Sequence, residues 1–323
     1  MIINDETYSD SHFSSNNVYF FSIGYEHRSY HLYEKIKSNI TNDNSICFVF
    51  DDYKKYAHAS NKIHEIKGKN IQIKEVNYSF SQVVQNAILS TLAPFIVKKA
   101  PITIHIDYSS MPRSWYCNIA IVLRKILRCN DQVYFWYSEG VYPNSYKEYP
   151  SAGIDAFSFF SGMPSLQVDK KRSHILAIGY DRIRTQAIVS ILDPKYLVTC
   201  YAYNTKRKEF QQAIKQVNSQ TLTNSALSLA LHIDEFSFMI SKLREVSNEL
   251  LVRGDVILIP DGPKPLIFAM SLVPTLIDRN GLSCMHVSRN KNHFNPVDVT
   301  ASGYVYGFSM RIINDTNTIS TEN

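Results

Sequence analysis

The sequence has no apolar run of about 18 residues, the length that a helix needs to cross a membrane. Its N-terminus also lacks the basic and apolar segments of a secretory signal peptide. The five cysteines are an odd number without Cys-x-x-Cys spacing, and most lie in apolar stretches, as small buried side chains do. These absences indicate a protein of the reducing cytoplasm, with no membrane partner expected.

Several motifs of common enzymes are missing. The sequence contains neither the Walker A spacing of NTPases nor the Gly-x-Gly-x-x-Gly of dehydrogenases, which disfavours both classes. The histidines show no metal-ligand spacing, so no metal site is expected. No Gly-x-Ser-x-Gly elbow supports a serine hydrolase, although a triad of residues distant in sequence stays open.

Charge of one sign is not concentrated anywhere in the chain. The net charge of +5 is mild, and no run of five basic residues occurs. A polyanionic ligand is therefore permitted and not required. The 21 tyrosines mostly have the spacing of core or interface residues, so nucleic-acid binding is not expected. A length of 323 residues suits two domains of about 150 residues each.

Apolar strands alternate with helical spacing along the chain. The expected strands are 18–23, 46–50, 71–76, 102–106, 133–137, 175–178, 196–203, 256–259 and 284–287, whereas 225–232 fits a strand or a helix. Nearly continuous apolar strands between helices predict an α/β fold of two Rossmann-like domains with mainly parallel sheets. The expected organisation is a polar leader 1–16, a first domain 17–142, a connector 143–172, a second domain 173–312 and a polar tail 313–323.

Two stretches of the chain read nearly alike. Residues 23–26 (Ile-Gly-Tyr-Glu) and 178–181 (Ile-Gly-Tyr-Asp) each end an apolar strand, and a basic residue and a helix follow. Asp107 follows Gly24 by 83 residues (107 − 24), and Asp261 follows Gly179 by 82 (261 − 179). Each Asp ends an apolar strand and precedes a proline, a basic residue and an apolar helix. The matched order predicts an internal duplication.

The loops after the fourth strands have features of an anion site, and ligands of open parallel sheets bind at the carboxyl ends of strands. Gly262 lets the backbone approach a ligand, the following helix offers free N–H groups, and Lys264 adds a positive charge. Ser109, Ser110 and Arg113 would serve the first half in the same way. The alternative is a rigid turn with a solvated lysine.

The loops after the first strands could complete each site with a base-stacking tyrosine, a carboxylate for ribose and an arginine for phosphate. The alternative is that acid and arginine pair and cap the helix. Glu139 and Arg289 end the fifth strands and could close each site. The candidate ligand-binding residues are Gly24, Tyr25, Glu26, Arg28, Asp107, Ser109, Ser110, Arg113, Glu139, Gly179, Tyr180, Asp181, Arg184, Asp261, Gly262, Lys264 and Arg289.

These loops also resemble those of a known family. A strand ending in Asp, a Gly- or Ser-bearing loop, a basic residue and an apolar helix, as at 107–113 and 261–265, resembles the strand-four loop of CRISPR-associated Rossmann-fold (CARF) ligand sensors. Two such units in one chain are similar to the SAVED type of cyclic-oligonucleotide sensor. The resemblance implies nucleotide or cyclic-nucleotide sensing in bacterial antiviral defence, with any effector on another chain, since no nuclease motif or winged helix is evident after residue 312.

Three hypotheses follow. The leading one is a binding module whose loops hold a phosphate-bearing nucleotide, with a protein partner or a homo-oligomer through which binding acts. The second is an enzyme acting on a nucleotide or nucleoside in the same clefts, with Asp107, Glu139 or Asp261 as acid or base. The third is a structural subunit of a defence complex with degenerate pockets. No cofactor beyond the nucleotide ligand is predicted.

Overall fold

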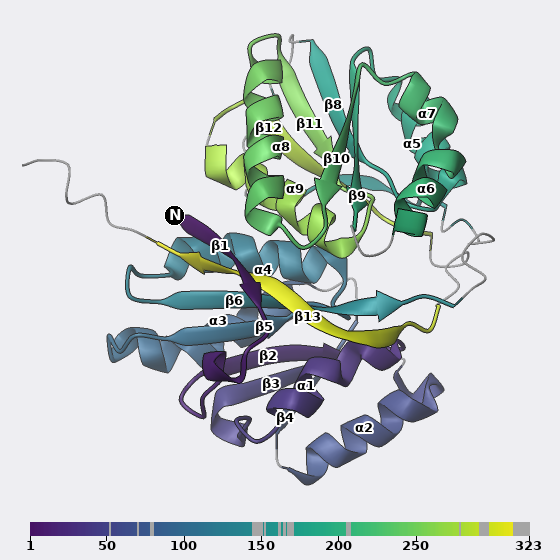
Figure 1. Cartoon of the computed structure of the whole chain (residues 1–323). Helices are drawn as coiled ribbons and strands as arrows, with labels where there is room; N and C mark the ends of the chain where they lie inside the picture. The colour runs from purple at the N-terminus through teal and green to yellow at the C-terminus, as the bar shows by residue number, and fades with distance from the viewer. Residues whose placement is uncertain are drawn as a thin grey trace, which may run out of the picture. The chain divides into compact units, whose positions relative to one another are not determined.

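The computed structural model describes residues 1–51, 53–69, 71–77, 81–143, 151, 153–160, 163, 166, 171–204, 208–277, 279–290 and 297–312. The chain divides into two compact units, and each is described here by itself (Figure 1). One unit comprises Met1–Trp115, Val122–Gly140 and Thr300–Asn323; the other comprises Tyr116–Ile121 and Val141–Val299. Within the described ranges, no helix is long and apolar enough to cross a bilayer.

The first domain is built on a seven-stranded sheet. Its order is β1 (Ile2–Thr7), β13 (Thr300–Arg311), β6 (Gln132–Val141), β5 (Thr103–Asp107), β2 (Val18–Ile23), β3 (Ser45–Phe50) and β4 (Gln72–Val76). The five strands from β6 to β4 are parallel, and β1 is antiparallel to β13. The inner parallel strands β2, β3 and β5 are mainly buried because helices cover both faces of the sheet, whereas the edge strand β4 contains Lys74 and Glu75.

Helices cover the first sheet on two sides. They are α1 (His31–Ile36), α2 (Ala57–Gly68), α3 (Ser81–Val97) and α4 (Arg113–Ile126). Alternate side chains of β2, such as Phe21, pack with α1 and α2 in one core cluster. On the opposite face Phe48 of β3 meets Trp115 of α4 edge-on, with ring centroids 6.2 Å apart. Right-handed crossovers place α1 and α2 on one face and α3 and α4 on the other, because the strand order reverses after β4.

The second domain has a six-stranded sheet. Its order is β10 (Leu227–His232), β9 (Leu197–Tyr203), β8 (Arg172–Ala177), β11 (Asp255–Ile259), β12 (Leu282–Val287) and β7 (Phe157–Phe159). All strands but β7 are parallel, and β7 is antiparallel to β12. The covering helices are α5 (Arg182–Leu192), α6 (Lys208–Val217), α7 (Ser219–Thr223), α8 (Phe236–Leu251) and α9 (Lys264–Ile277).

The parallel strands of the two domains share one order. Numbered along the chain within each domain, both sheets read 3-2-1-4-5: β4-β3-β2-β5-β6 and β10-β9-β8-β11-β12. The predicted fold class, two Rossmann-like domains with mainly parallel sheets flanked by helices, is therefore confirmed. The order reverses between β2 and β5, and between β8 and β11. These are the points at which open α/β sheets bind ligands.

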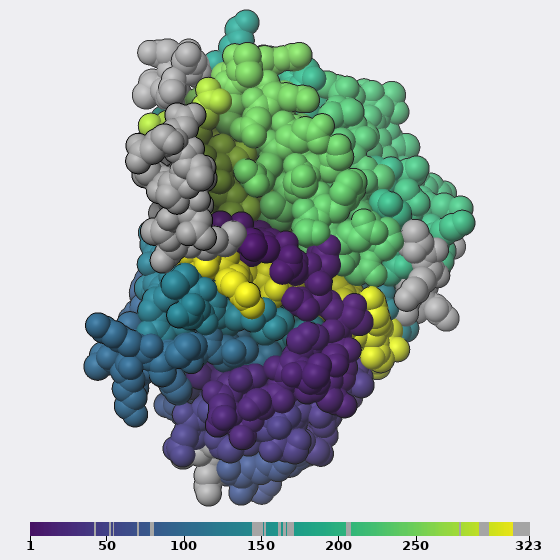
Figure 2. Space-filling view, turned by 60° about the vertical axis from the view of Figure 1, so that its left-hand side comes forward, coloured from purple at the N-terminus to yellow at the C-terminus, as the bar shows by residue number. Residues whose placement is uncertain are grey.

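Three expected boundaries differ from the structure. Residues 1–16 are not a loose leader, because Ile2–Thr7 is an edge strand. The second unit ends at residue 299 and not at 312, because β13 joins the first sheet; Figure 2 shows the purple N-terminal and yellow C-terminal segments side by side. A side-chain carbon at Gly307 of β13 would lie 1.9 Å from the Phe135 carbonyl oxygen, so glycine permits this close pairing. Part of the expected connector is strand β7, and the expected tail lies outside the described residues.

Candidate functional site

The loop after β2 meets the loop after β5 at the switch point of the first domain. A side-chain carbon at Gly24 would lie 2.4 Å from Ser110 Oγ and 2.7 Å from Phe50 Cε2, so the contact requires glycine. The backbone N–H of Ser109 donates to Asp107 Oδ1 at 2.9 Å. Ser109 Oγ in turn accepts from the N–H of Ser138 on β6 at 2.7 Å. Asp107 and Ser109 are buried and brace this loop.

Arg28 connects the first loop to β6. Its side chain is 2% exposed, and its Nε donates to Glu26 Oε2 at 2.7 Å. Its Nη1 donates to the Tyr137 hydroxyl at 2.7 Å and to the Ser138 carbonyl at 3.4 Å. The guanidinium also lies over the Tyr137 ring, 5.1 Å from the centroid. The charge is thus neutralised and hydrogen-bonded inside the protein.

Arg184 occupies the corresponding place in the second domain. It is 1% exposed, and its Nε lies 2.9 Å from both carboxylate oxygens of Asp261. Its Nη2 donates to the Val287 carbonyl at 2.7 Å, and its Nη1 donates to the carbonyls of Ser288, at 3.2 Å, and Gly153. The carbonyls of Val287 and Ser288 lie at the end of β12. From α5, which follows β8, the arginine therefore reaches across the switch point to the ends of β11 and β12.

Both domains contain a buried acid–arginine pair, which the alternative interpretation of the first loops predicts, but in the second domain the acid is a different residue. In the first domain Glu26 pairs with Arg28, as that interpretation predicts. Asp181 does not pair with Arg184 through its guanidinium; it caps α5, with Oδ1 accepting from the Arg184 backbone N–H at 2.9 Å. Both guanidinium groups donate their hydrogen bonds to protein acceptors. A phosphate contact at either arginine therefore stays a prediction, and it would require these hydrogen bonds to rearrange.

A basic residue begins the helix after the fourth strand in each domain. Arg113 is the first residue of α4 and Lys264 is the first residue of α9, and both are half-buried. The positive end of the helix dipole disfavours a cation at this position, whereas a bound anion would be stabilised by the dipole and by the side chain together. Gly262, just before α9, lies close to the residue that follows β8. A side-chain carbon added at Gly262 would lie 3.3 Å from the carbonyl oxygen of Ile178.

The tyrosines of the first loops each meet a second aromatic ring. Tyr25 lies 5.9 Å from Tyr56, which precedes α2, and Tyr180 lies 6.2 Å from Phe210 of α6. In both domains the second ring comes from the segment that follows the second strand. Sequence reasoning did not single out Tyr56 or Phe210, because they have no local feature that sets them apart from core residues.

The remaining candidates lie at the ends of the fifth strands. Glu139 is within β6, and its Oε2 accepts from the hydroxyl of Ser302, a β13 residue, at 2.7 Å. Arg289 is exposed just beyond β12. In the described part of the chain, no group of three His, Cys, Asp or Glu side chains could hold a metal ion.

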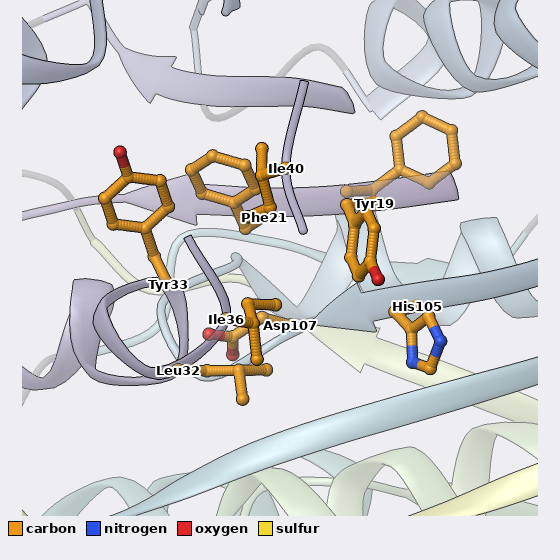
Figure 3. A pocket seen from close by; sticks show the side chains of 9 residues that line it. Tyr19, Phe21, Leu32, Tyr33, Ile36, Ile40, His105 and Asp107 are labelled. Carbon is orange, nitrogen blue, oxygen red and sulfur yellow. The ribbon is translucent and has the colours of Figure 1, made fainter. Parts of the chain in front are cut away.

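A small cavity lies between β2 and α1 (Figure 3). Its volume of 10 Å³ is about the space for one water molecule, so it is no nucleotide site. His105 is one of its polar lining residues, and burial lowers the pKa of this histidine to about 3. Its Nδ1 accepts from the Trp136 indole N–H at 3.0 Å, which requires a neutral ring. His105 is thus a satisfied core histidine, as its place on a core strand predicts.

Comparisons with known proteins add one finding. No protein-family model matches the chain. No curated protein sequence matches it either. Among solved structures, it is similar to a type III CRISPR defence DNA nuclease activated by cyclic oligoadenylate, with a TM-score of 0.51 and 8% identity. The match covers 84% of this chain and 65% of the nuclease chain. At this identity the likeness concerns the fold alone.

Proposed function

We propose that the chain is a nucleotide or cyclic-nucleotide sensor of a bacterial antiviral defence system and acts in the cytoplasm. The observation that carries this proposal is the placement of Arg113 and Lys264, each the first residue of the helix at a Rossmann-type switch point. The same strand order in both domains supports a duplicated binding unit. The fold likeness to a defence nuclease activated by cyclic oligoadenylate favours a ligand of that chemistry.

In this proposal the phosphates lie at the N-termini of α4 and α9, where backbone N–H groups and the basic side chains face them. A base stacks on the half-buried rings of Tyr25 or Tyr180. Binding stabilises one conformation of the chain over others, which is how a sensor reports its ligand.

Thermal melting with cyclic oligoadenylates, AMP and inorganic phosphate tests the proposal. A ligand at 100 times its dissociation constant stabilises the folded state by about 2.7 kcal/mol, which raises the midpoint by several degrees. Lys264→Ala should abolish or strongly reduce the shift. Lys242→Ala is the control, because Lys242 is a half-buried residue of α8 whose ion pair with Glu245 lies at the surface. No shift with any nucleotide, or an unchanged shift in Lys264→Ala, contradicts the proposal.

The same samples separate a sensor from an enzyme. Glu139 is the half-exposed acid among the three catalytic candidates, whereas Asp107 and Asp261 are buried and brace loops. A sensor leaves the nucleotide intact during incubation, as chromatography would measure. Slow consumption that is lost in Glu139→Gln would favour the enzyme.

A further inference from the structure

The two sheets end in four edge strands, and one differs from the rest. The edge strand β1 contains Asp5 and Glu6, β4 contains Lys74 and Glu75, and β7 has three residues. Charged side chains and short length both keep sheet edges from pairing with other chains. The edge strand β10 reads Leu-Ser-Leu-Ala-Leu-His over six residues, without Lys, Arg, Asp, Glu or Pro. It therefore lacks the protection that the other edges have.

The outer edge of β10 presents backbone groups in a regular pattern. The N–H of Ile233, directly after β10, donates to the Tyr203 carbonyl of β9 at 2.9 Å, in step with a parallel register along the whole of β10. Backbone groups alternate between the two edges of a strand, so those of Ser228 and Ala230 face away from β9. Leu227 is 42% exposed, and Ser228 and Ala230 are exposed as well. The first four residues of β10 are thus accessible.

We propose that β10 pairs antiparallel with β10 of a second copy of this chain, around a two-fold axis at Leu229. The outward groups of Ser228 and Ala230 are symmetric about Leu229, so the axis places Leu229 opposite its own copy and Ser228 opposite the partner's Ala230. Ser228 and the partner's Ala230 exchange both backbone hydrogen bonds, and the two Leu229 residues between them form a non-hydrogen-bonded pair. The pairing continues one six-stranded sheet into the other.

A second copy fits this edge better than a charged partner does. Self-pairing places uncharged side chains opposite uncharged side chains, and like charges directly opposite each other would destabilise a strand pair. A two-fold contact also uses the same patch on both subunits, which closes the assembly at a dimer. This interaction surface lies within the second domain and is independent of the proposed ligand.

A cysteine at the axis tests the geometry. Opposite residues of a non-hydrogen-bonded antiparallel pair have Cα atoms about 4.5 Å apart, within the range of about 4.4–6.8 Å that a disulfide spans. Leu229→Cys in a Cys129→Ser background, which removes the one native cysteine that is not buried, should form a covalent dimer on mild oxidation. Lys74→Cys on the charged edge β4, in the same background, should form no covalent dimer. A Leu229→Cys chain that does not cross-link overturns the proposal.

Light scattering without nucleotide tests the dimer directly. The wild-type chain should approach twice its 37.1 kDa mass as the protein concentration rises, and Leu229→Lys should remain monomeric with an unchanged melting midpoint. A wild-type chain that stays monomeric, or a Leu229→Lys chain that dimerises as the wild type does, is incompatible with β10 pairing. If Leu229→Lys does not fold, the cross-linking result decides.

Discussion

Removing the charge of Asp261 tests whether its pair with Arg184 braces the second domain. Asp261→Asn keeps the size of the side chain but leaves a guanidinium that is 1% exposed without its counter-ion. Breaking one partner of a buried ion pair costs about 3–5 kcal/mol. Arg184 keeps the carbonyls of Val287 and Ser288, and the new amide can still accept one hydrogen bond. We therefore expect the lower end, about 3 kcal/mol.

Thermal and urea unfolding followed by circular dichroism measure this cost. At about 2–4 °C for each kcal/mol, the loss lowers the midpoint of the second domain by about 6–12 °C. Glu245→Gln is the matched control, because the Lys242–Glu245 pair of α8 has the same kind of short contact, 2.7 Å, with side chains 41% and 54% exposed. An exposed pair contributes about 0–1 kcal/mol, so the control should melt nearly as the wild type does.

Two outcomes would refute the bracing role. Asp261→Asn could melt with the control, which would mean that the pair adds nothing to the fold. Alternatively, the double variant Arg184→Met/Asp261→Leu could be no more stable than Asp261→Asn, although apolar replacement of both partners should recover stability. If Asp261→Asn keeps its midpoint but loses the nucleotide-induced shift, Asp261 belongs to the ligand site and not to a brace.

Three further predictions use the same assays. Because burial lowers the pKa of His105 to about 3, the unfolded chain binds this proton below about pH 6.5 while the folded chain does not. Stability is therefore lost as the pH falls from about 6.5 toward 3, by up to about 1.4 kcal/mol per pH unit, and urea midpoints of His105→Gln should show a flatter acid slope. Gly24→Ala should lower the melting midpoint by the equivalent of about 1–3 kcal/mol, whereas Gly179→Ala, whose new carbon would lie 3.6 Å from its nearest neighbour, should change it little. Among the five cysteines only Cys129 is not buried, so a thiol reagent should label it first and the other four only on unfolding; early labelling of another thiol would contradict the packing.

The parallel strands could be predicted from sequence for a simple reason. A strand covered on both faces must be apolar at nearly every position, so Val18–Ile23 stands out as a local run. The stretch 225–232, which fitted a strand or a helix, contains the strand β10. Because β10 lies at an exposed edge of its sheet, apolar and polar residues are mixed along it. The carboxyl ends of parallel strands lie at the same edge of the sheet. The loops that follow the first and fourth strands of each domain could therefore be expected to lie at one edge.

The antiparallel additions could not be predicted in this way. Four of the six residues of β1 are polar and the strand is mostly exposed, so it has no apolar signature. Its partner β13 lies at the other end of the chain, and in their register Ile2 is opposite Arg311. No local pattern encodes a pairing over such a separation. The buried residues 305–310 are the one local signal of β13 in the described part of the chain, and Gly307 interrupts it.

The contacts among the candidate residues could be predicted only in part. Spacing correctly brought the Gly24 loop against Ser110 and the Gly179 loop against Asp261. Spacing could not choose the partner of Arg184, because Asp181 and Asp261 are both within reach of a long side chain. The backbone decides: α5 needs a cap at its N-terminus, and Asp181 provides it.

The two domains share a topology but hold their fourth-strand loops differently. In the first domain, Asp107 accepts hydrogen bonds from Ser109, and the arginine charge is balanced by Glu26 within its own loop. In the second domain, Asp261 itself balances Arg184. Hydrogen bonds to a charged group contribute about 1.5–3 kcal/mol each, and breaking a buried ion pair costs about 3–5 kcal/mol, so the two arrangements are of similar strength. They differ in what they connect: Asp107 is bonded within its own loop, whereas Asp261 ties its loop to Arg184 of α5.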